Sequence, residues 1–221
     1  MKKGFTILEL LLVIGVLSLL MAISIPVIRS IHATALKRRA QSEATLLVQA
    51  AMRYRAEYGF WPGQLVLAPG SRHVQYHGKI PAASRFPLIV SGPSSLFKGV
   101  HLPPGTGSLL HLQSNEVCQA FSRIDSLQKG WRKTNPLNPK GIRFLDLRNE
   151  GNIGAVSFPD PWENPYVLIL GIDPRSTFTL PVPHQNAALS RISVSNVTAF
   201  AFSFGPEGAE GTNYIYSTGV R

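Results

Sequence analysis

The chain has 221 residues and a formal net charge of +10, from 22 lysines and arginines against 12 aspartates and glutamates. The chain is long enough for one globular domain with a core, given domain sizes of about 50–200 residues. The single cysteine, Cys118, excludes an internal disulfide.

The positive charge is concentrated in the first part of the chain. Residues 5–140 hold 15 basic and 5 acidic residues, whereas residues 141–221 hold 5 basic and 7 acidic ones. A basic half suits nucleic acid, but no basic motif with interleaved aromatic residues occurs. The cluster Lys37-Arg38-Arg39 follows an apolar segment, where it suits lipid head groups. Composition therefore favours a membrane partner and disfavours a nucleic-acid partner.

The apolar segment runs from Phe5 to Ile28 and is long enough to cross a bilayer as a helix, which takes about 20 residues. Its polar side chains are few: Thr6, Glu9, Ser18 and Ser24. A secretory signal would end in a small-x-small cleavage site, and Leu-Met-Ala-Ile-Ser at 20–24 is a poor match. We therefore expect residues 5–28 to be retained as a transmembrane helix.

Glu9 is the most informative residue of this segment, because an ionised side chain at the bilayer centre costs about 2.5–3.5 kcal/mol. The order of a short basic leader, Gly4, Phe5 and Glu9 resembles the N-terminus of type IV prepilins and pseudopilins. The resemblance implies that residues 1–4 are a leader, that a membrane aspartyl peptidase cuts between Gly4 and Phe5, and that Phe5 becomes N-methylated. It also implies that Glu9 attracts the Phe5 amine of an adjacent subunit and sets the register of assembly.

The helical pattern continues beyond the apolar segment to Tyr58. Pro26 lies within it, where it removes a backbone hydrogen bond; the family has a proline at the same place. Small and apolar residues then recur at spacings of three and four, which predicts an amphipathic half over residues 29–58 that packs on a core. Its stripe is Ala44, Leu47, Ala51, Tyr54 and Tyr58, and Gly59 is the expected stop.

The middle of the chain is less informative. Residues 63–107 are rich in Gly, Pro and Ser and predict loops with short strands, and Ser114–Leu127 predicts a short helix. His73 and His77 lack the helical setting and the glutamate of a zinc motif, so we expect surface histidines. No catalytic motif was found, and the chain is not expected to be an enzyme.

The last part of the chain predicts three strands, over 141–147, 165–170 and 196–204. A long helix followed by strands indicates an α+β fold, with the helix packed on an antiparallel sheet as in pilins. We expect the globular extracytoplasmic domain to occupy residues 59–221.

The segment Asp160-Pro-Trp-Glu-Asn-Pro-Tyr166 resembles the DPWGNPY-like turn that precedes a strand in major pseudopilins. Glu163 replaces the usual glycine. Pro161 and Pro165 fix φ, Asp160 and Asn164 can bond the local backbone, and Trp162 can cover the core, so a structural use is expected.

The glycine-rich stretch 202–213 resembles the calcium-binding loop of major pseudopilins, but the consecutive aspartates are absent. Glu207, Glu210 and Asn213 remain as candidate calcium ligands, with only two carboxylates for an ion that prefers six to eight oxygens. A glycine loop that holds itself without metal is the alternative, and no other cofactor is expected.

Together these resemblances imply a pseudopilin of a type II secretion system, in the inner membrane as a single-pass protein with a periplasmic C-terminal domain. Its expected partners are other pseudopilins, the prepilin peptidase and an inner-membrane platform with a cytoplasmic ATPase. Two alternatives stay open: a type IV or DNA-uptake pilin, and a membrane-anchored binding domain with a pilin-like leader.

Overall fold

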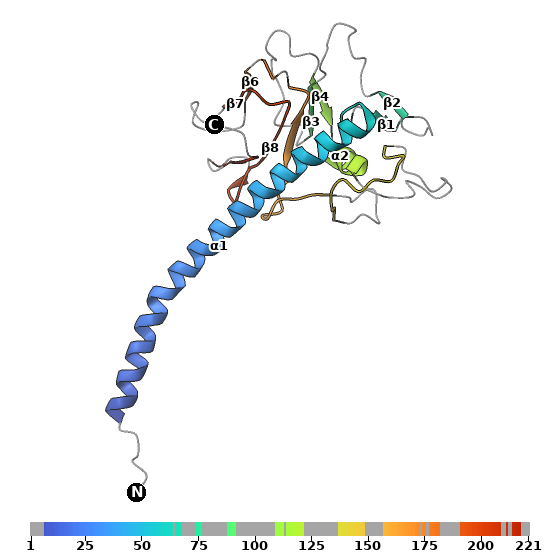
Figure 1. The fold of residues 1–221 in the computed structure, drawn as a ribbon. Coiled ribbons are helices and arrows are strands. Elements are labelled where there is room, and N and C mark those ends of the chain that lie inside the picture. The colour runs from blue at the N-terminus through green and yellow to red at the C-terminus, as the bar shows by residue number, and fades with distance from the viewer. Residues whose placement is uncertain are drawn as a thin grey trace. The chain divides into compact units, whose positions relative to one another are not determined.

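The computed structural model gives the fold of the chain (Figure 1). It describes residues 7–63, 65–67, 74–76, 88–91, 109–112, 114–121, 137–148, 157–172, 174–175, 177–181, 191–208, 211 and 214–217.

A single helix, α1, runs from Ile7 to Tyr58 and accounts for 52 residues. It continues through Pro26. At its end, Gly59 adopts a left-handed φ of 81°, and its N–H donates to the Arg55 carbonyl at 2.8 Å. That conformation is open to glycine at little cost, which explains why the helix stops here. The predicted long helix and its glycine stop are confirmed.

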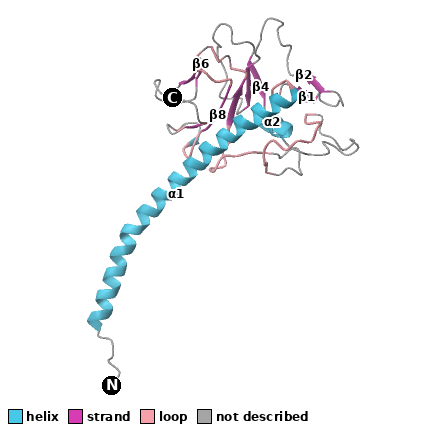
Figure 2. Ribbon diagram, viewed as in Figure 1, coloured by secondary structure: helices cyan, strands magenta, loops and turns pink. Residues whose placement is uncertain are grey.

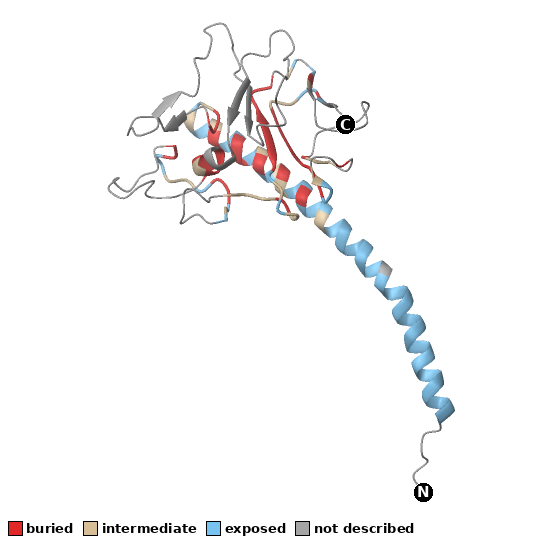
Figure 3. Ribbon diagram, turned by 180° about the vertical axis from the view of Figure 1, so that it is seen from behind, coloured by how far each residue is buried: buried red, intermediate tan, exposed pale blue. Residues whose placement is uncertain are grey.

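Contacts divide the chain into two compact units between Arg39 and Ala40. The described side chains of the first unit are almost all exposed, and this part of α1 is pale blue in Figure 3. In the second unit, four residues of the predicted stripe are buried, namely Ala44, Leu47, Ala51 and Tyr54. The remainder of α1 beyond Ala40 is therefore part of the globular core.

The core sheet has five strands in the order β4-β3-β5-β8-β9. Their bounds are β3 Leu88–Ser91, β4 Leu109–Leu112, β5 Val167–Leu170, β8 Ala199–Ser203 and β9 Ile215–Tyr216. All neighbours are antiparallel except β3 and β4, which run parallel. Two antiparallel pairs lie outside this sheet: β1 Leu65–Leu67 with β2 Val74–Tyr76, and β6 Phe178–Pro181 with β7 Arg191–Val194. The α+β, pilin-like arrangement is confirmed, with one parallel pair that the sequence did not predict.

The neighbouring strands β5 and β8 are buried on both faces. A core cluster forms between α1 and the sheet. Strand β8 contributes two small side chains to it, Ala199 and Ala201, and β5 contributes Leu168 and Leu170. Residues of β8 that alternate with the alanines are aromatic: the Phe200 and Phe202 rings stack 5.8 Å apart. Because successive side chains point to opposite faces, small residues face the helix and bulky rings fill the other side.

A second helix, α2, spans Ser114–Phe121 and lies beside the last turns of α1 (Figure 2). Its Phe121 ring contacts the Tyr54 ring edge-on at a centroid distance of 6.3 Å. The prediction of a helix starting at Ser114 is confirmed, while residues 122–127 lie outside the described part of the chain.

The predicted strand over residues 141–147 is wrong: this segment is irregular. The Asn138 side chain bonds both backbone groups of Ile142, which a neighbouring strand would otherwise have bonded. Its Nδ2 donates to the Ile142 carbonyl at 2.7 Å, and its Oδ1 accepts from the Ile142 N–H at 3.1 Å. Gly141 has a φ of 62°, which breaks the extended chain. The alternation of apolar and polar residues in this segment was therefore not sufficient to predict a strand, because a strand also needs a neighbour to pair with.

The other two predicted strands are confirmed with shorter bounds. The third begins at Ala199 rather than 196 because Asn196 has a left-handed φ of 59°. The second begins at Val167, after a turn that is described below.

An aromatic cluster closes the end of α1. Tyr54 contacts Tyr58, Phe60 and Phe144 at ring-centroid distances of 4.7, 5.8 and 5.3 Å. Its hydroxyl donates to the Leu137 carbonyl at 2.6 Å, and the Tyr58 hydroxyl donates to Asn138 Oδ1 at 2.6 Å. These bonds tie the irregular segment 137–147 to the helix.

Alkaline solution is expected to destabilise the globular unit. Burial raises the pKa of the Cys118 thiol from 9.0 to about 12, although a hydrogen bond from the Phe158 backbone opposes this, and burial raises the pKa of Tyr54 as well. Both groups keep their protons when folded and lose them more readily when unfolded. Their contribution to the free energy of unfolding is therefore fully present below pH about 9. It falls as the pH rises towards 12, by about 1 kcal/mol per pH unit for the thiol. Urea unfolding at a series of pH values measures this slope, which Cys118→Ala should reduce; an equal slope in both proteins would contradict it.

Candidate functional site

The exposed half of α1 is the first candidate site. Nineteen large hydrophobic residues are exposed in the described part of the chain, and seventeen of them lie between Ile7 and Ile31. An aqueous surface this apolar is unfavourable, so it marks contact with lipid or protein. α1 is long and apolar enough to cross a membrane, a property that a signal sequence would share.

Glu9 lies in the first turn of α1, and its side chain is exposed. It is the only charged residue from Ile7 to Ile28. A carboxylate near a helix N-terminus is favoured by the helix dipole, typically by about 0.3–1 kcal/mol. The residues of the predicted cleavage site, Gly4 and Phe5, lie outside the described residues, as does the side chain of Pro26, the second predicted assembly residue.

Two serine hydroxyls of this half bond to their own helix. Ser18 Oγ donates to the Ile14 carbonyl and Ser24 Oγ to the Leu20 carbonyl, each at 2.7 Å. A polar group in hydrocarbon must be satisfied internally, because water is absent there. The two serines therefore suit an apolar environment, and Glu9 differs from them in carrying a charge.

The Asp160 turn, residues 160–166, is the second candidate site. Asp160 is fully buried, and its Oδ1 accepts the N–H groups of Trp162 at 2.9 Å and Asn164 at 2.8 Å. Its own N–H donates to the Asn164 carbonyl at 2.8 Å. The predicted use of Asp160 for local backbone bonds fits this geometry. Trp162 is only half-buried, and Pro161 and Pro165 flank the bonded groups.

The turn is joined to the glycine-rich stretch by two long-range bonds. Ser203 Oγ donates to Asp160 Oδ2 at 2.5 Å and accepts the Gly205 N–H at 2.9 Å. Asn164 Nδ2 donates to the Gly205 carbonyl at 3.1 Å. The role of Ser203 was not predicted from the sequence. Its hydroxyl lies between Phe202 and Phe204 in an apolar run, and a buried hydroxyl needs a hydrogen-bond partner, so this pattern could have indicated it.

Tyr166 joins the same turn to α1. Its hydroxyl donates to Glu43 Oε2 at 2.8 Å and lies 3.2 Å from the Ala40 carbonyl oxygen. Ala40 is the first residue of the globular unit. The Asp160 turn thus connects three parts of this unit: α1, the start of β5 and the loop after β8.

The candidate calcium loop is described only in part. Glu207 is exposed, while Glu210 and Asn213 lie outside the described residues, as do His73 and His77. Where the chain is described, no group of three or more His, Cys, Asp or Glu residues is arranged to hold a metal ion. Calcium binding by this loop stays a prediction.

Gly211→Ala is expected to destabilise the loop. A Cβ at Gly211 would overlap Glu207 Cβ and lie 2.8 Å from Glu207 Oε2 and 3.3 Å from the Gly208 carbonyl oxygen. The Glu207 Cβ is attached to the backbone and cannot move away unless the turn moves with it. We therefore expect the free energy of unfolding to fall by about 2–3 kcal/mol. Gly208→Ala is the matched control: a Cβ there meets open space, and its φ of 71° costs about 1–2 kcal/mol. Urea unfolding compares the two variants, and a larger loss for Gly208→Ala would contradict the assignment.

No family model, curated protein or solved structure matches this chain.

Proposed function

We propose that this protein is a pseudopilin, a subunit that assembles through its N-terminal helix into a periplasmic filament of the type II secretion kind. The observation that carries the proposal is the exposed apolar stretch of α1 from Ile7 to Ile28, in which Glu9 is the single charged residue. The resemblance of the leader and of the Asp160 turn to pseudopilins supports it.

The apolar half suits two successive environments. Before assembly its seventeen exposed hydrophobic side chains would lie in lipid, which solvates them well. In a filament the same side chains would pack against neighbouring helices, and association would then depend on close packing and on polar contacts rather than on a hydrophobic driving force. A helix that is apolar on all sides can make contacts in several directions, as a helical array requires.

Glu9 provides the polar contact in this proposal. A carboxylate in hydrocarbon and a free amine at Phe5 each carry an electrostatic penalty, and pairing them between subunits offsets both. Because only one such carboxylate is present in residues 7–28, one axial stagger would satisfy it. Other staggers would leave a buried charge without its counter-ion.

The globular unit would face the periplasm. Lys2 and Lys3 favour a cytoplasmic N-terminus, while Lys37, Arg38 and Arg39 would meet head groups on the opposite side. The proposed partners are other pseudopilins, a prepilin peptidase that cuts after Gly4, and an inner-membrane platform with a cytoplasmic ATPase. The protein would act by assembly and not as an enzyme.

The test is intact mass and N-terminal analysis of the protein from membranes of cells with and without prepilin peptidase, followed by a filament shear assay. The expected result is a chain that begins at N-methylated Phe5 and appears in the sheared fraction only when peptidase is active. Gly4→Val should block both.

Other outcomes separate the alternatives. A Met1 terminus in peptidase-active cells would overturn the proposal and favour an anchored binding domain. Long surface filaments that do not affect secretion would favour a type IV or DNA-uptake pilin.

A further inference from the structure

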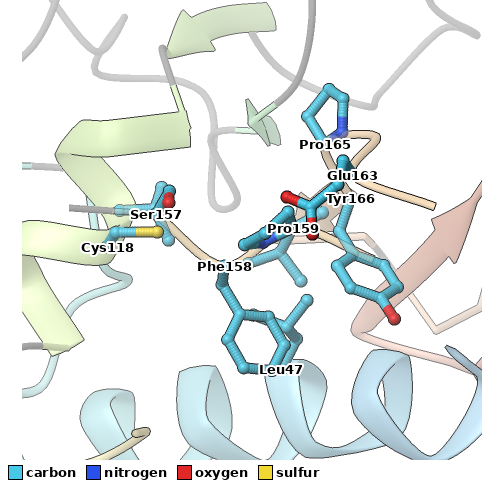
Figure 4. A pocket seen from close by; sticks show the side chains of 10 residues that line it. Leu47, Cys118, Ser157, Phe158, Pro159, Glu163, Pro165 and Tyr166 are labelled. Carbon is cyan, nitrogen blue, oxygen red and sulfur yellow. The ribbon is translucent and has the colours of Figure 1, made fainter. Parts of the chain in front are cut away.

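A pocket opens in the globular unit beside the Asp160 turn. Its volume is about 270 Å³, and it lies between α1, α2, the segment 157–166 and β5 (Figure 4). An apolar cavity of about 150 Å³ accommodates benzene, so by proportion this pocket accommodates about ten non-hydrogen atoms. It lies within one compact unit of the chain.

The pocket wall is mostly apolar. It is formed by Leu47 from α1, Val117 from α2, Leu168 from β5, and Phe158, Pro159 and Pro165 from the connecting segment. Among its polar groups, the Cys118 thiol stays protonated because burial raises its pKa to about 12, and the Tyr166 hydroxyl is bonded to Glu43. Ser157 is uncharged. Among the described residues of the wall, the formal charge is the Glu163 carboxylate.

Glu163 holds an unusual backbone conformation. Its φ is 66°, in the left-handed region that costs an L-residue about 1–2 kcal/mol and that glycine adopts freely. Strained non-glycine residues often occur at functional sites, where the side chain has a use. Figure 4 shows the carboxylate extending from the turn towards the side of the pocket with Ser157 and Cys118.

The carboxylate is only partly neutralised. Arg148 Nη1 contacts Oε1 at 2.7 Å from outside the pocket, and both side chains are about half exposed or more, so this pair is weak. The second oxygen, Oε2, accepts no hydrogen bond from the described residues. It remains able to accept one from a ligand.

We propose that this pocket binds a small organic cation, an ammonium group carried on an apolar body of about ten non-hydrogen atoms. The apolar wall takes the body, and Glu163 accepts from the ammonium at the mouth. An anion of the same shape is repelled by Glu163, and a neutral analogue loses the charge-assisted bond. The described residues that form this site all belong to the globular unit of one chain, so ligand binding can be measured on unassembled protein.

Three probes with the same phenyl body test the charge preference: 2-phenylethylamine, 2-phenylethanol and phenylacetate. Binding is measured by ligand-observed NMR with the full chain in nonionic detergent at pH 7. We expect the amine to bind at least tenfold more tightly than phenylacetate and more tightly than the alcohol. Glu163→Gln should abolish the preference of amine over alcohol, and Arg148→Ala should strengthen amine binding because it frees Oε1.

Ser157→Leu controls for partition of the probes into detergent, since its larger side chain fills the pocket and should remove the specific signal for all three. If Ser157→Leu fails to fold by circular dichroism, the two charge variants still decide the question, because Glu163 and Arg148 are exposed. Equal binding of amine and carboxylate, an unchanged preference in Glu163→Gln, or no binding to the wild-type chain would overturn the proposal. None of these results depends on whether filaments form.

Discussion

Glu9→Ala is expected to lower the amount of sheared filament at least tenfold while leaving the folded globular unit unchanged. The carboxylate is the only charge between Ile7 and Ile28, so no other residue of that segment can take over its role towards a neighbouring amine. Without it, the Phe5 amine of the next subunit would be buried without a counter-ion, which is a strong penalty in hydrocarbon.

The same substitution has an opposite expected effect on the unassembled subunit. Removing an ionised side chain from the span lowers the cost of insertion, by at most the ~2.5–3.5 kcal/mol that applies at the bilayer centre, so membranes should hold as much Glu9→Ala protein as wild type, or more. Quantitative blotting of membrane and sheared fractions measures both effects. Ser18→Ala is the matched control, because its hydroxyl bonds to its own helix and its loss should leave assembly intact. Normal filament yield from Glu9→Ala would contradict the assembly role.

Asp160→Ala is expected to be the most destabilising single substitution in the globular unit, with a loss of about 3–5 kcal/mol. The buried carboxylate accepts hydrogen bonds from Trp162, Asn164 and Ser203. Alanine would leave the buried Ser203 hydroxyl and the two part-buried N–H groups without this acceptor, and a buried donor without an acceptor costs about 1–3 kcal/mol. Both the turn before β5 and the loop after β8 should loosen together, because they share this one side chain.

Urea unfolding of the full chain measures the loss, with Asp146→Ala as the control. Asp146 is a highly exposed aspartate paired with Arg143 at 3.0 Å, and its removal should change stability by less than about 1 kcal/mol. Asp160→Asn should fall between the two, since the amide oxygen still accepts from the turn while the amide nitrogen cannot accept from Ser203. Equal effects of Asp160→Ala and Asp146→Ala would show that the network is not important for stability.

Local pattern was sufficient to predict the features that depend on neighbouring residues. α1 and its buried face followed from residues three and four apart, such as Ala44, Leu47 and Ala51, and its end followed from Gly59. Strands β5 and β8 followed from short apolar runs bounded by turn residues. Glu9 was visible as a charge in an apolar segment.

Features that depend on distant pairing were not predictable. The parallel direction of β3 and β4 is set by the path of the chain between them, which a local pattern does not encode. Residues 141–147 alternate like a strand, yet Asn138 takes the backbone groups that a neighbouring strand would need. Ser203 and Asp160 are 43 residues apart, so their bond appears only in the fold. The sequence shows Glu163 at a position where the resemblance implies glycine. It does not predict the pocket beside Glu163, because the wall of that pocket comes from segments far apart in the chain.

The buried residues of α1 begin at Ala40, immediately after the first unit ends. A shortened protein that starts one turn earlier, near Leu36, would keep every side chain that α1 contributes to the core. It would lack all the exposed hydrophobic residues from Ile7 to Ile31 and should stay dissolved in water without detergent. Shortening at Gly59 instead would uncover the alanine face of the sheet, and such a protein should aggregate. The point at which the chain is cut therefore decides whether it can be handled as a soluble protein.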